Sequence, residues 1–148
     1  MRRLIIAATL TGVLGCSPPR PLERPRPRYP DMLREARVSG TEIARLRVDR
    51  HGVVSDVTFD STAHIHDLFT VSARNTLRAV RFRPATRFGI AHAGVFRYSI
   101  HYFLGGPPSA ERGTLSSGDS VPGCPRARDE THLVVCSVPL LSHARTTH

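Results

Sequence analysis

Two stretches of the chain alternate between apolar and polar side chains. In residues 41–49 the apolar positions Ala44, Leu46 and Val48 are separated by arginines. Residues 95–103 alternate in the same way, with an apolar set of Phe96, Tyr98, Ile100 and Tyr102. A repeat of two residues is typical of a strand with one face on the core and the other in solvent. Both stretches are therefore predicted to be half-buried strands.

A third strand is predicted directly after the first. A turn at residues 50–52 contains Gly52, and residues 53–60 then return with Val57 and Phe59 in phase. Val54 is out of phase with this pair, which predicts a bulge near Ser55-Asp56. We expect residues 41–49 and residues 53–60 to form an antiparallel hairpin.

Two other segments have helical spacing. In residues 67–81 the apolar side chains form one stripe, which consists of Phe69, Ala73, Leu77 and Val80. Pro84 follows and cannot continue the helix. A shorter amphipathic helix is expected to begin at Pro30 and to stop at Gly40.

The predicted order of elements in residues 29–104 is helix, strand, strand, helix, strand. A small sheet on its own leaves its apolar face in water, so both helices are expected to cover that face. The predicted fold class is therefore α+β, with a three-stranded antiparallel sheet and two helices on one face.

The N-terminus is predicted to be an export signal. Arg2 and Arg3 precede the eleven-residue apolar run from Leu4 to Leu14, which as a helix would extend only about 17 Å, roughly half of a bilayer core. The run leads into Leu14-Gly15-Cys16, which resembles the lipobox of bacterial lipoproteins. The resemblance implies that residues 1–15 are a signal peptide and that Cys16 is lipidated. Ordinary cleavage nearby, with Cys16 as a passive thiol, is the alternative.

Residues 16–28 are predicted to be a linker after the lipidated cysteine. Residues 17–28 contain five prolines and four arginines, a composition that favours an extended, solvated chain. Any domain behind this linker would lie close to the membrane that holds the anchor.

The charge of the chain is +9, and all 21 basic residues are arginine. About half of this surplus lies in residues 1–28, outside the predicted domain. Export would also separate the protein from nucleic acid, so no nucleic-acid partner is expected.

The landmarks of the domain resemble those of the TonB C-terminal domain family. In chain order they are Tyr29-Pro30, Gly40, Val48-Asp49, Gly52 and Phe82-x-Pro84-Ala85, and they cover residues 28–104. The resemblance implies a periplasmic module that binds outer-membrane transporters through a short segment added to its sheet. An energy transducer of this family has an uncleaved membrane helix and a long spacer. The short apolar run and brief linker here imply the binding module without the coupling role.

Strand addition needs a sheet edge with unpaired backbone groups. The last predicted strand is our candidate edge, and the side chains expected to face the partner are Val95, Arg97, Ser99 and His101. Two alternatives stay open: the C-terminal residues cover this edge, or the side chains are only solvated.

Residues 105–148 are predicted to be a flexible tail that contains a loop closed by a disulfide. An exported protein meets an oxidising compartment, and lipidation of Cys16 leaves Cys124 and Cys136 as a pair, so we predict a disulfide between them. The apolar run 132–136 is expected to form a strand of this loop.

A metal site is the rival interpretation of the tail. Two thiols and two imidazoles occur there, at Cys124, His132, Cys136 and His143. Their spacing fits no common zinc pattern, and a disulfide would remove the thiolates. His64 and His66 form a second histidine pair, which is expected to be solvated. We expect neither a metal nor a cofactor.

No catalytic group is predicted. Ser99 and His101 lie on one strand face, but no third residue that would orient them is identifiable. The sequence therefore predicts a lipid-anchored, periplasm-facing envelope module that binds a protein, with an outer-membrane transporter as the partner that the resemblance implies. The alternative is a structural or stability accessory lipoprotein of the periplasm with no peptide-binding edge.

Overall fold

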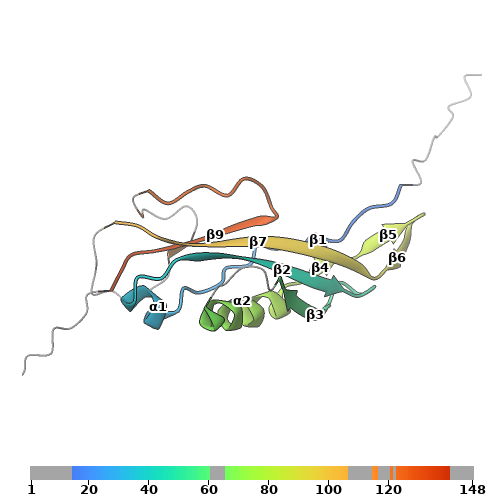
Figure 1. The fold of residues 1–148 in the computed structure, drawn as a ribbon. Helices are drawn as coiled ribbons and strands as arrows, with labels where there is room; N and C mark the ends of the chain where they lie inside the picture. The colour runs from blue at the N-terminus through green and yellow to red at the C-terminus, as the bar shows by residue number, and fades with distance from the viewer. Residues whose placement is uncertain (1–14, 61–65, 107–114, 117–120, 122, 141–148) are drawn as a thin grey trace, which may run out of the picture.

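The structure is a computed structural model that describes residues 15–60, 66–106, 115–116, 121 and 123–140. The predicted signal peptide up to residue 14, much of the tail, His64 and His143 lie outside the described residues. The chain contains both helices and strands, as predicted (Figure 1). In chain order they are β1 (Arg20–Pro21), α1 (Asp31–Glu35), β2 (Gly40–Val48), β3 (Val54–Phe59), α2 (Asp67–Ala79), β4 (Phe82–Arg83), β5 (Ala85–Arg87), β6 (Ile90–His92), β7 (Gly94–Leu104), β8 (Leu115–Ser116) and β9 (His132–Ser137).

The main sheet has five strands in the order β3-β2-β7-β9-β8. β2 pairs antiparallel with β3, as predicted for the hairpin, and on its other side it pairs antiparallel with β7. β9 then pairs with β7 in parallel, and β8 pairs antiparallel with β9. The prediction of a three-stranded sheet is therefore wrong in extent, because the tail adds two strands.

The predicted bulge is present in β3. The register passes from Arg47 opposite Asp56 to Val48 opposite Val54, which leaves Ser55 as the extra residue. The extra residue turns both Val54 and Val57 toward the core, and each is less than a tenth exposed. The inserted Ser55 therefore explains why Val54 and Val57 are out of phase in the sequence although both face the core.

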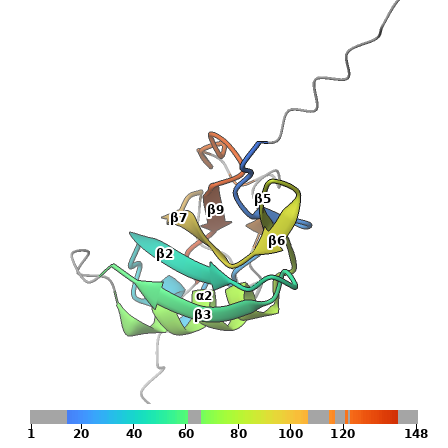
Figure 2. The same cartoon turned by 90° about the vertical axis from the view of Figure 1, so that its right-hand side faces the viewer.

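Both helices cover the same face of the sheet. The α2 stripe is confirmed, since Phe69, Ala73 and Leu77 are fully buried, and Figure 2 shows α2 beneath β2 and β3. α1 contributes Leu33 to the same core. It ends earlier than predicted, because Arg37 takes a positive φ of 55° and the chain then closes with a hydrogen bond from the Val38 amide to the Leu33 carbonyl.

Three aromatic rings join distant parts of the chain in this core. Tyr29 meets Phe69 and Tyr102 edge-on at centroid distances of 5.3 and 5.6 Å, and Phe69 stacks on Tyr102 at 4.1 Å. The cluster connects the N-terminal segment, α2 and β7. Aromatic pairs in such geometries each stabilise a core by about 1 kcal/mol beyond their buried area.

The proline-rich segment packs on the domain, so the expectation of a solvated linker is wrong for its described residues. β1 pairs with β4, with Arg20 opposite Arg83. Pro19, Pro25 and Pro27 are buried. Proline is compatible with this extended path, and its ring is an apolar surface that gains by leaving water.

A short hairpin that the sequence pattern did not predict stands at one end of the molecule (Figure 1). Its strands β5 and β6 pair antiparallel with Arg87 opposite Ile90. The two turn residues are Phe88 and Gly89, with φ of 53° and 79°. Positive φ at both central positions is the signature of a type I′ turn.

Candidate protein-interaction surface

β7 is an internal strand along the half that carries Ser99 and His101. The pairing with β9 runs from Ser99 opposite His132 to Leu104 opposite Ser137, and the Ser99 amide donates to the Thr131 carbonyl at 2.9 Å. The prediction that this strand offers a free edge at Ser99 and His101 is therefore wrong. The open alternative, in which C-terminal residues cover the edge, is what the structure shows.

The covering strand is part of the main core. Leu133 and Val135 of β9 are 2% and 3% exposed and belong to the same cluster as Ile100 and Tyr102. Removing β9 would return these apolar side chains to water, which costs roughly 2 kcal/mol for each of them. β9 is thus held by burial as well as by backbone hydrogen bonds.

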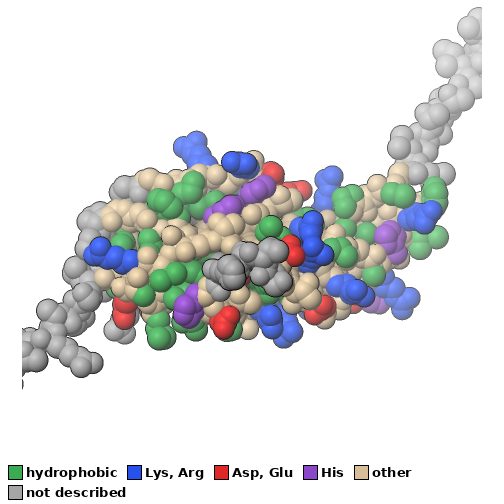
Figure 3. All heavy atoms as spheres, viewed as in Figure 1, with side chains coloured by type: hydrophobic (Ala, Val, Ile, Leu, Met, Phe, Trp, Pro, Cys, Tyr) green, Lys and Arg blue, Asp and Glu red, His purple; other side chains and the backbone are tan. Residues whose placement is uncertain are grey.

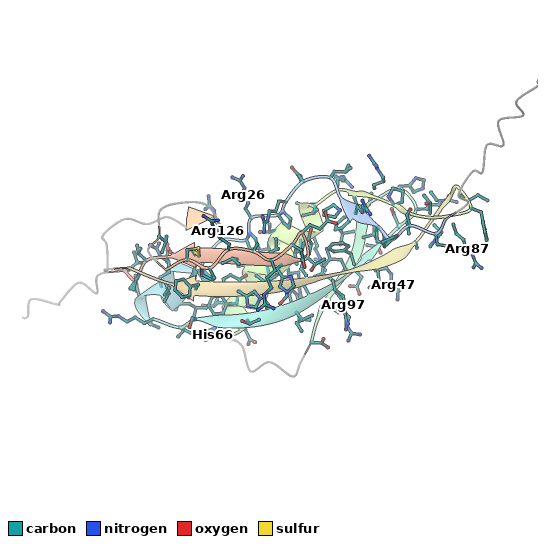
Figure 4. All side chains as sticks on the ribbon, turned by 90° about the horizontal axis from the view of Figure 1, so that it is seen from above. Arg26, Arg47, His66, Arg87, Arg97 and Arg126 are labelled. Carbon is teal, nitrogen blue, oxygen red and sulfur yellow. A yellow bond between two sulfur atoms is a disulfide. The ribbon has the colours of Figure 1, made fainter. Side chains whose placement is uncertain are left out.

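Val95 and Arg97 lie on the other half of β7, before the pairing with β9 begins. Both side chains are on the outer face and more than half exposed, with Val95 at 60%. Arg97 stands opposite Arg45 on β2, and the carboxylate of Asp60 lies 3.4 Å from the Arg45 guanidinium and 3.8 Å from that of Arg97. Figure 4 shows Arg97 pointing away from the ribbon. At the end of this half, Pro19 packs on Gly94, so the proline-rich segment flanks it.

The side chains of Ser99 and His101 line a cleft on the outer face of the sheet. The cleft encloses about 500 Å³ between the outer face of the sheet and residues 125–128. His101 contacts the hydroxyls of Thr41 at 3.0 Å and of Ser99 at 3.2 Å, and its ring stacks on His132 at 6.0 Å. Figure 3 shows histidine side chains at the surface over β9.

The charge around this cleft disfavours a protonated His101. Burial lowers the pKa of its imidazole, and the nearby His132 and Arg128 lower it further. Among the described residues, the hydrogen-bond partners of its ring nitrogens are hydroxyls, whereas a catalytic triad places a carboxylate there. His132, which was predicted as the first residue of a strand and weighed as a metal ligand, has its Nδ1 atom 2.9 Å from the Asp129 carboxylate.

The predicted disulfide is present. Cys124 and Cys136 are bonded, with their Cα atoms 5.9 Å apart. Cys136 is fully buried next to Val121 and Val134, so the bridge ties the loop after residue 121 to β9. Both sulfurs are used in this bond, so neither is a thiolate that could bind zinc here, and His143 lies outside the described residues. Across the part of the chain that the structure describes, no group of three or more metal-binding side chains occurs.

His66 has a structural role at the start of α2. Its Nδ1 atom accepts a hydrogen bond from the Leu68 amide at 3.3 Å, as the side chain of a helix N-cap does. Its predicted partner His64 lies outside the described residues.

Cys16 is exposed and is a free thiol. The next residue, Ser17, pairs with Thr86 of β5 through two backbone hydrogen bonds of 2.9 Å and a hydroxyl contact of 2.6 Å. Cys16 is therefore held beside the β5–β6 hairpin and not at the end of a loose spacer.

On the side of the sheet opposite β9, the last strand is β3, and it has a free edge. The Asp60 amide donates to Ile43 of β2, and Thr58 is opposite Arg45. Backbone groups of a strand alternate in direction, so those of Thr58 face β2 whereas those of Val57 and Phe59 face outward. Among the described residues, these outward groups have no hydrogen-bond partner. Local apolar periodicity could not reveal which strand lies at the edge, because the order of strands depends on long-range pairing.

The remaining findings concern membrane helices and the similarity of the chain to known proteins. No helix within the described ranges has the length and apolarity needed to cross a membrane. No curated protein matches the chain. The family model described as Gram-negative bacterial TonB protein C-terminal matches residues 25–104, which is more than half of the chain. β8 and β9 lie beyond the matched residues. With its central strands, both helices and the buried Tyr29 inside that match, the chain belongs to the family of Gram-negative bacterial TonB protein C-terminal domains.

Proposed function

We propose that this chain is a lipid-anchored, periplasm-facing envelope protein whose TonB-type domain binds an extended segment of another envelope protein, such as an outer-membrane transporter. Membership of the family supports an envelope protein-interaction module. The observation that carries the binding mechanism is the edge of β3, where the backbone groups of Val57 and Phe59 point out of the sheet. A guest strand would hydrogen-bond to these groups.

Side chains on β3 define the kind of guest. Asp56 and Thr58 are exposed, and a charged residue on an edge strand opposes pairing with a second copy of the same edge. A guest that places arginine or lysine opposite Asp56 would meet an opposite charge across the strands, which stabilises a cross-strand pair by up to about 1 kcal/mol. We therefore propose a basic, extended segment as the partner.

Crosslinking in native envelopes tests this proposal. A photoreactive amino acid at Thr58 is expected to capture an envelope protein, whereas the same group at Val71, an exposed position on α2, is the matched control. Capture from both positions with equal yield, or from neither, would contradict recognition at β3.

Hydrogen exchange supplies an independent readout with the captured protein. The amides of Val57 and Phe59 are expected to exchange more slowly when the partner is bound, while the Thr58 amide, which already faces β2, stays unchanged. Uniform protection across the strand would indicate general stabilisation in place of an added strand.

The lipid anchor is tested separately. The Cys16→Ala substitution is expected to move the protein from the membrane fraction to the soluble periplasmic fraction, because a lipid chain could no longer be attached. A variant that fractionates like its parent would remove the anchor from the proposal and leave the β3 edge untouched.

A structural accessory role is the second candidate. The observation that favours it is the coverage of β7 by β9, which is buried in the core and fixed by the disulfide. This candidate predicts no capture from Thr58 and no slowing of exchange at Val57. For both candidates we propose a binding or structural role without catalysis, because the imidazole of His101 faces hydroxyls.

A further inference from the structure

The tip of the β5–β6 hairpin exposes large apolar side chains. Ile90 is 73% exposed and Phe88 is 57% exposed, and every residue from 87 to 93 is exposed. Single exposed apolar residues are common on protein surfaces, but here two lie at the apex of a projecting two-stranded ribbon. Figure 3 shows hydrophobic and basic side chains side by side at this end of the molecule.

The conformation of Phe88 makes its presence at the tip unusual. With φ at 53°, it occupies the turn position that asparagine or glycine fills with least strain. Core packing of the ring does not offset this strain, because Phe88 is more than half exposed to solvent. Strained positions are often tied to function, so the exposed ring itself requires an explanation.

The predicted attachment point of lipid lies at the same end. The two backbone hydrogen bonds between Ser17 and Thr86 fix Cys16 beside β5, and Thr86 is two residues from Phe88. Figure 1 shows the N-terminal segment running to the end of the molecule that carries β5 and β6, with α1 at the opposite end. A bilayer that held an acyl chain on Cys16 would therefore face the hairpin tip.

Basic side chains accompany the apolar ones. The guanidinium of Arg87 lies 5.6 Å from the centre of the Phe88 ring, and Figure 4 shows Arg87 at this end of the molecule. Arg20 and Arg83 stand opposite each other on the adjoining strands β1 and β4, and both are exposed. Arginine near a membrane surface is attracted to anionic lipid headgroups.

We propose that the β5–β6 tip is a membrane-contact site, in which Phe88 and Ile90 enter the boundary between headgroups and acyl chains while Arg87 contacts anionic headgroups. The inference rests on the proposed anchor at Cys16 for its orientation and on the exposed tip for its chemistry. It implies that the domain stands on the membrane with α1 at the end farthest from the lipid. The partner of this surface is a lipid bilayer.

Tryptophan fluorescence tests the proposal without interference, because the chain contains no tryptophan. The exported protein with Ile90→Trp is mixed with vesicles of phosphatidylethanolamine and phosphatidylglycerol, with or without bromine on the acyl chains. We expect the emission to shift to shorter wavelength and to lose most of its intensity with brominated lipid. Val71→Trp, on exposed α2, is the matched control and is expected to keep its emission.

Phe88→Asn separates membrane contact from folding. Asparagine suits the positive φ, so this variant is expected to melt at a higher temperature than its parent. In the Cys16→Ala, Ile90→Trp background, loss of the Phe88 ring is expected to raise the lipid concentration for half quenching about tenfold or more.

The outcomes separate this site from the anchor. Unquenched emission from position 90 in a protein that remains with the vesicles overturns the tip site, and so does quenching that Phe88→Asn leaves unchanged. Quenching in the Cys16→Ala background supports the tip even where fractionation disproves the anchor. If the tip bound a protein instead, protein-free vesicles would leave the emission unaltered, which also overturns the proposal.

Discussion

The amide of Phe82 donates a 2.9 Å hydrogen bond to the carbonyl oxygen of Gly52, and this contact leaves no room for a side chain at position 52. A Cβ atom there would lie 1.9 Å from the Phe82 carbonyl oxygen, a backbone atom that cannot rotate away. Gly52 also has φ of 79°. The turn after β2 is thus fastened to the segment that follows α2.

Gly52→Ala is therefore expected to destabilise the protein by about 3 kcal/mol or more, from backbone strain and overpacking together. Gly89→Ala is the matched control, because Gly89 has the same φ of 79° and nothing within 4 Å of its added Cβ. Only the backbone strain remains there, at roughly 1 kcal/mol. Urea unfolding of both variants measures the two changes in the free energy of unfolding. Equal changes would show that the close approach of the Phe82 carbonyl adds nothing to the cost of the Gly52 substitution.

Tyr98 carries a hydroxyl that the fold does not satisfy. Its side chain is fully buried, and its hydroxyl oxygen has no hydrogen-bond partner among the described residues. Tyr98→Phe removes this buried polar atom and keeps the ring, so we expect a stabilisation of about 1 kcal/mol.

Tyr29→Phe is the matched control for that substitution. The hydroxyl of Tyr29 donates to the Val38 carbonyl, and its loss is expected to cost about 1 kcal/mol. Thermal melts of the two variants should therefore move in opposite directions. A lower melting temperature for Tyr98→Phe would mean that its hydroxyl does find a partner in solution.

The elements that sequence analysis located best are those with one buried face. The stripe on α2 and the alternation of β7 have a clear period because one side of each element meets water. The bulge at Ser55 was predictable for the same reason, since a single inserted residue shifts Val54 out of phase with Val57.

The elements that were missed or misplaced lack such a period. In β9, residues 133–137 are all buried, as in parallel strands that are covered on both faces. Its apolar run predicted a strand but not the neighbour with which it pairs. β6 is exposed throughout, and its turn uses Phe88 where a recognisable hairpin would have asparagine. The candidate edge was wrong at Ser99 and His101, which β9 covers, because the order of strands depends on long-range pairing that the local apolar pattern does not contain.

Reduction of the Cys124–Cys136 disulfide is expected to lower the free energy of unfolding by about 3 kcal/mol, because a closed loop of this length restricts the unfolded chain. Urea unfolding with and without reductant measures the loss. The double variant Cys124→Ser, Cys136→Ser should be insensitive to reductant, and Cys16→Ala should retain the full sensitivity of its parent. Identical unfolding of the parent protein in both conditions would show that the bond does not contribute to stability.

Glu42 is a carboxyl group buried between β2 and α2. It is 1% exposed, Thr70 donates a 3.1 Å hydrogen bond to Oε2, and Oε1 has no partner among the described residues. Burial raises the pKa of this carboxyl, although the hydrogen bond from Thr70, the nearby hydroxyl of Tyr102 and the charge of Arg74 act in the opposite direction. The folded protein therefore binds this proton more tightly than the unfolded chain does.

The contribution of Glu42 to stability is consequently complete below the pKa of the unfolded chain and is lost as the pH rises through the higher pKa of the folded state. Glu42→Gln, which is neutral at every pH, should remove this loss, so that the stability of the variant relative to the parent increases from pH 4 to pH 7. Asp49→Asn provides a contrast of opposite sign. Hydrogen bonds from the Val53 and His51 amides lower the pKa of Asp49, and the charges of His51 and Arg81 lower it further. The stabilisation from Asp49 is present above the pKa of the unfolded chain and fades as the pH falls through the folded value. Unfolding free energies measured from about pH 2 to pH 7 test both signs, since Asp49 acts below about pH 4 and Glu42 above it. A pH-independent difference between Glu42→Gln and the parent would show that the buried carboxyl keeps its ordinary pKa.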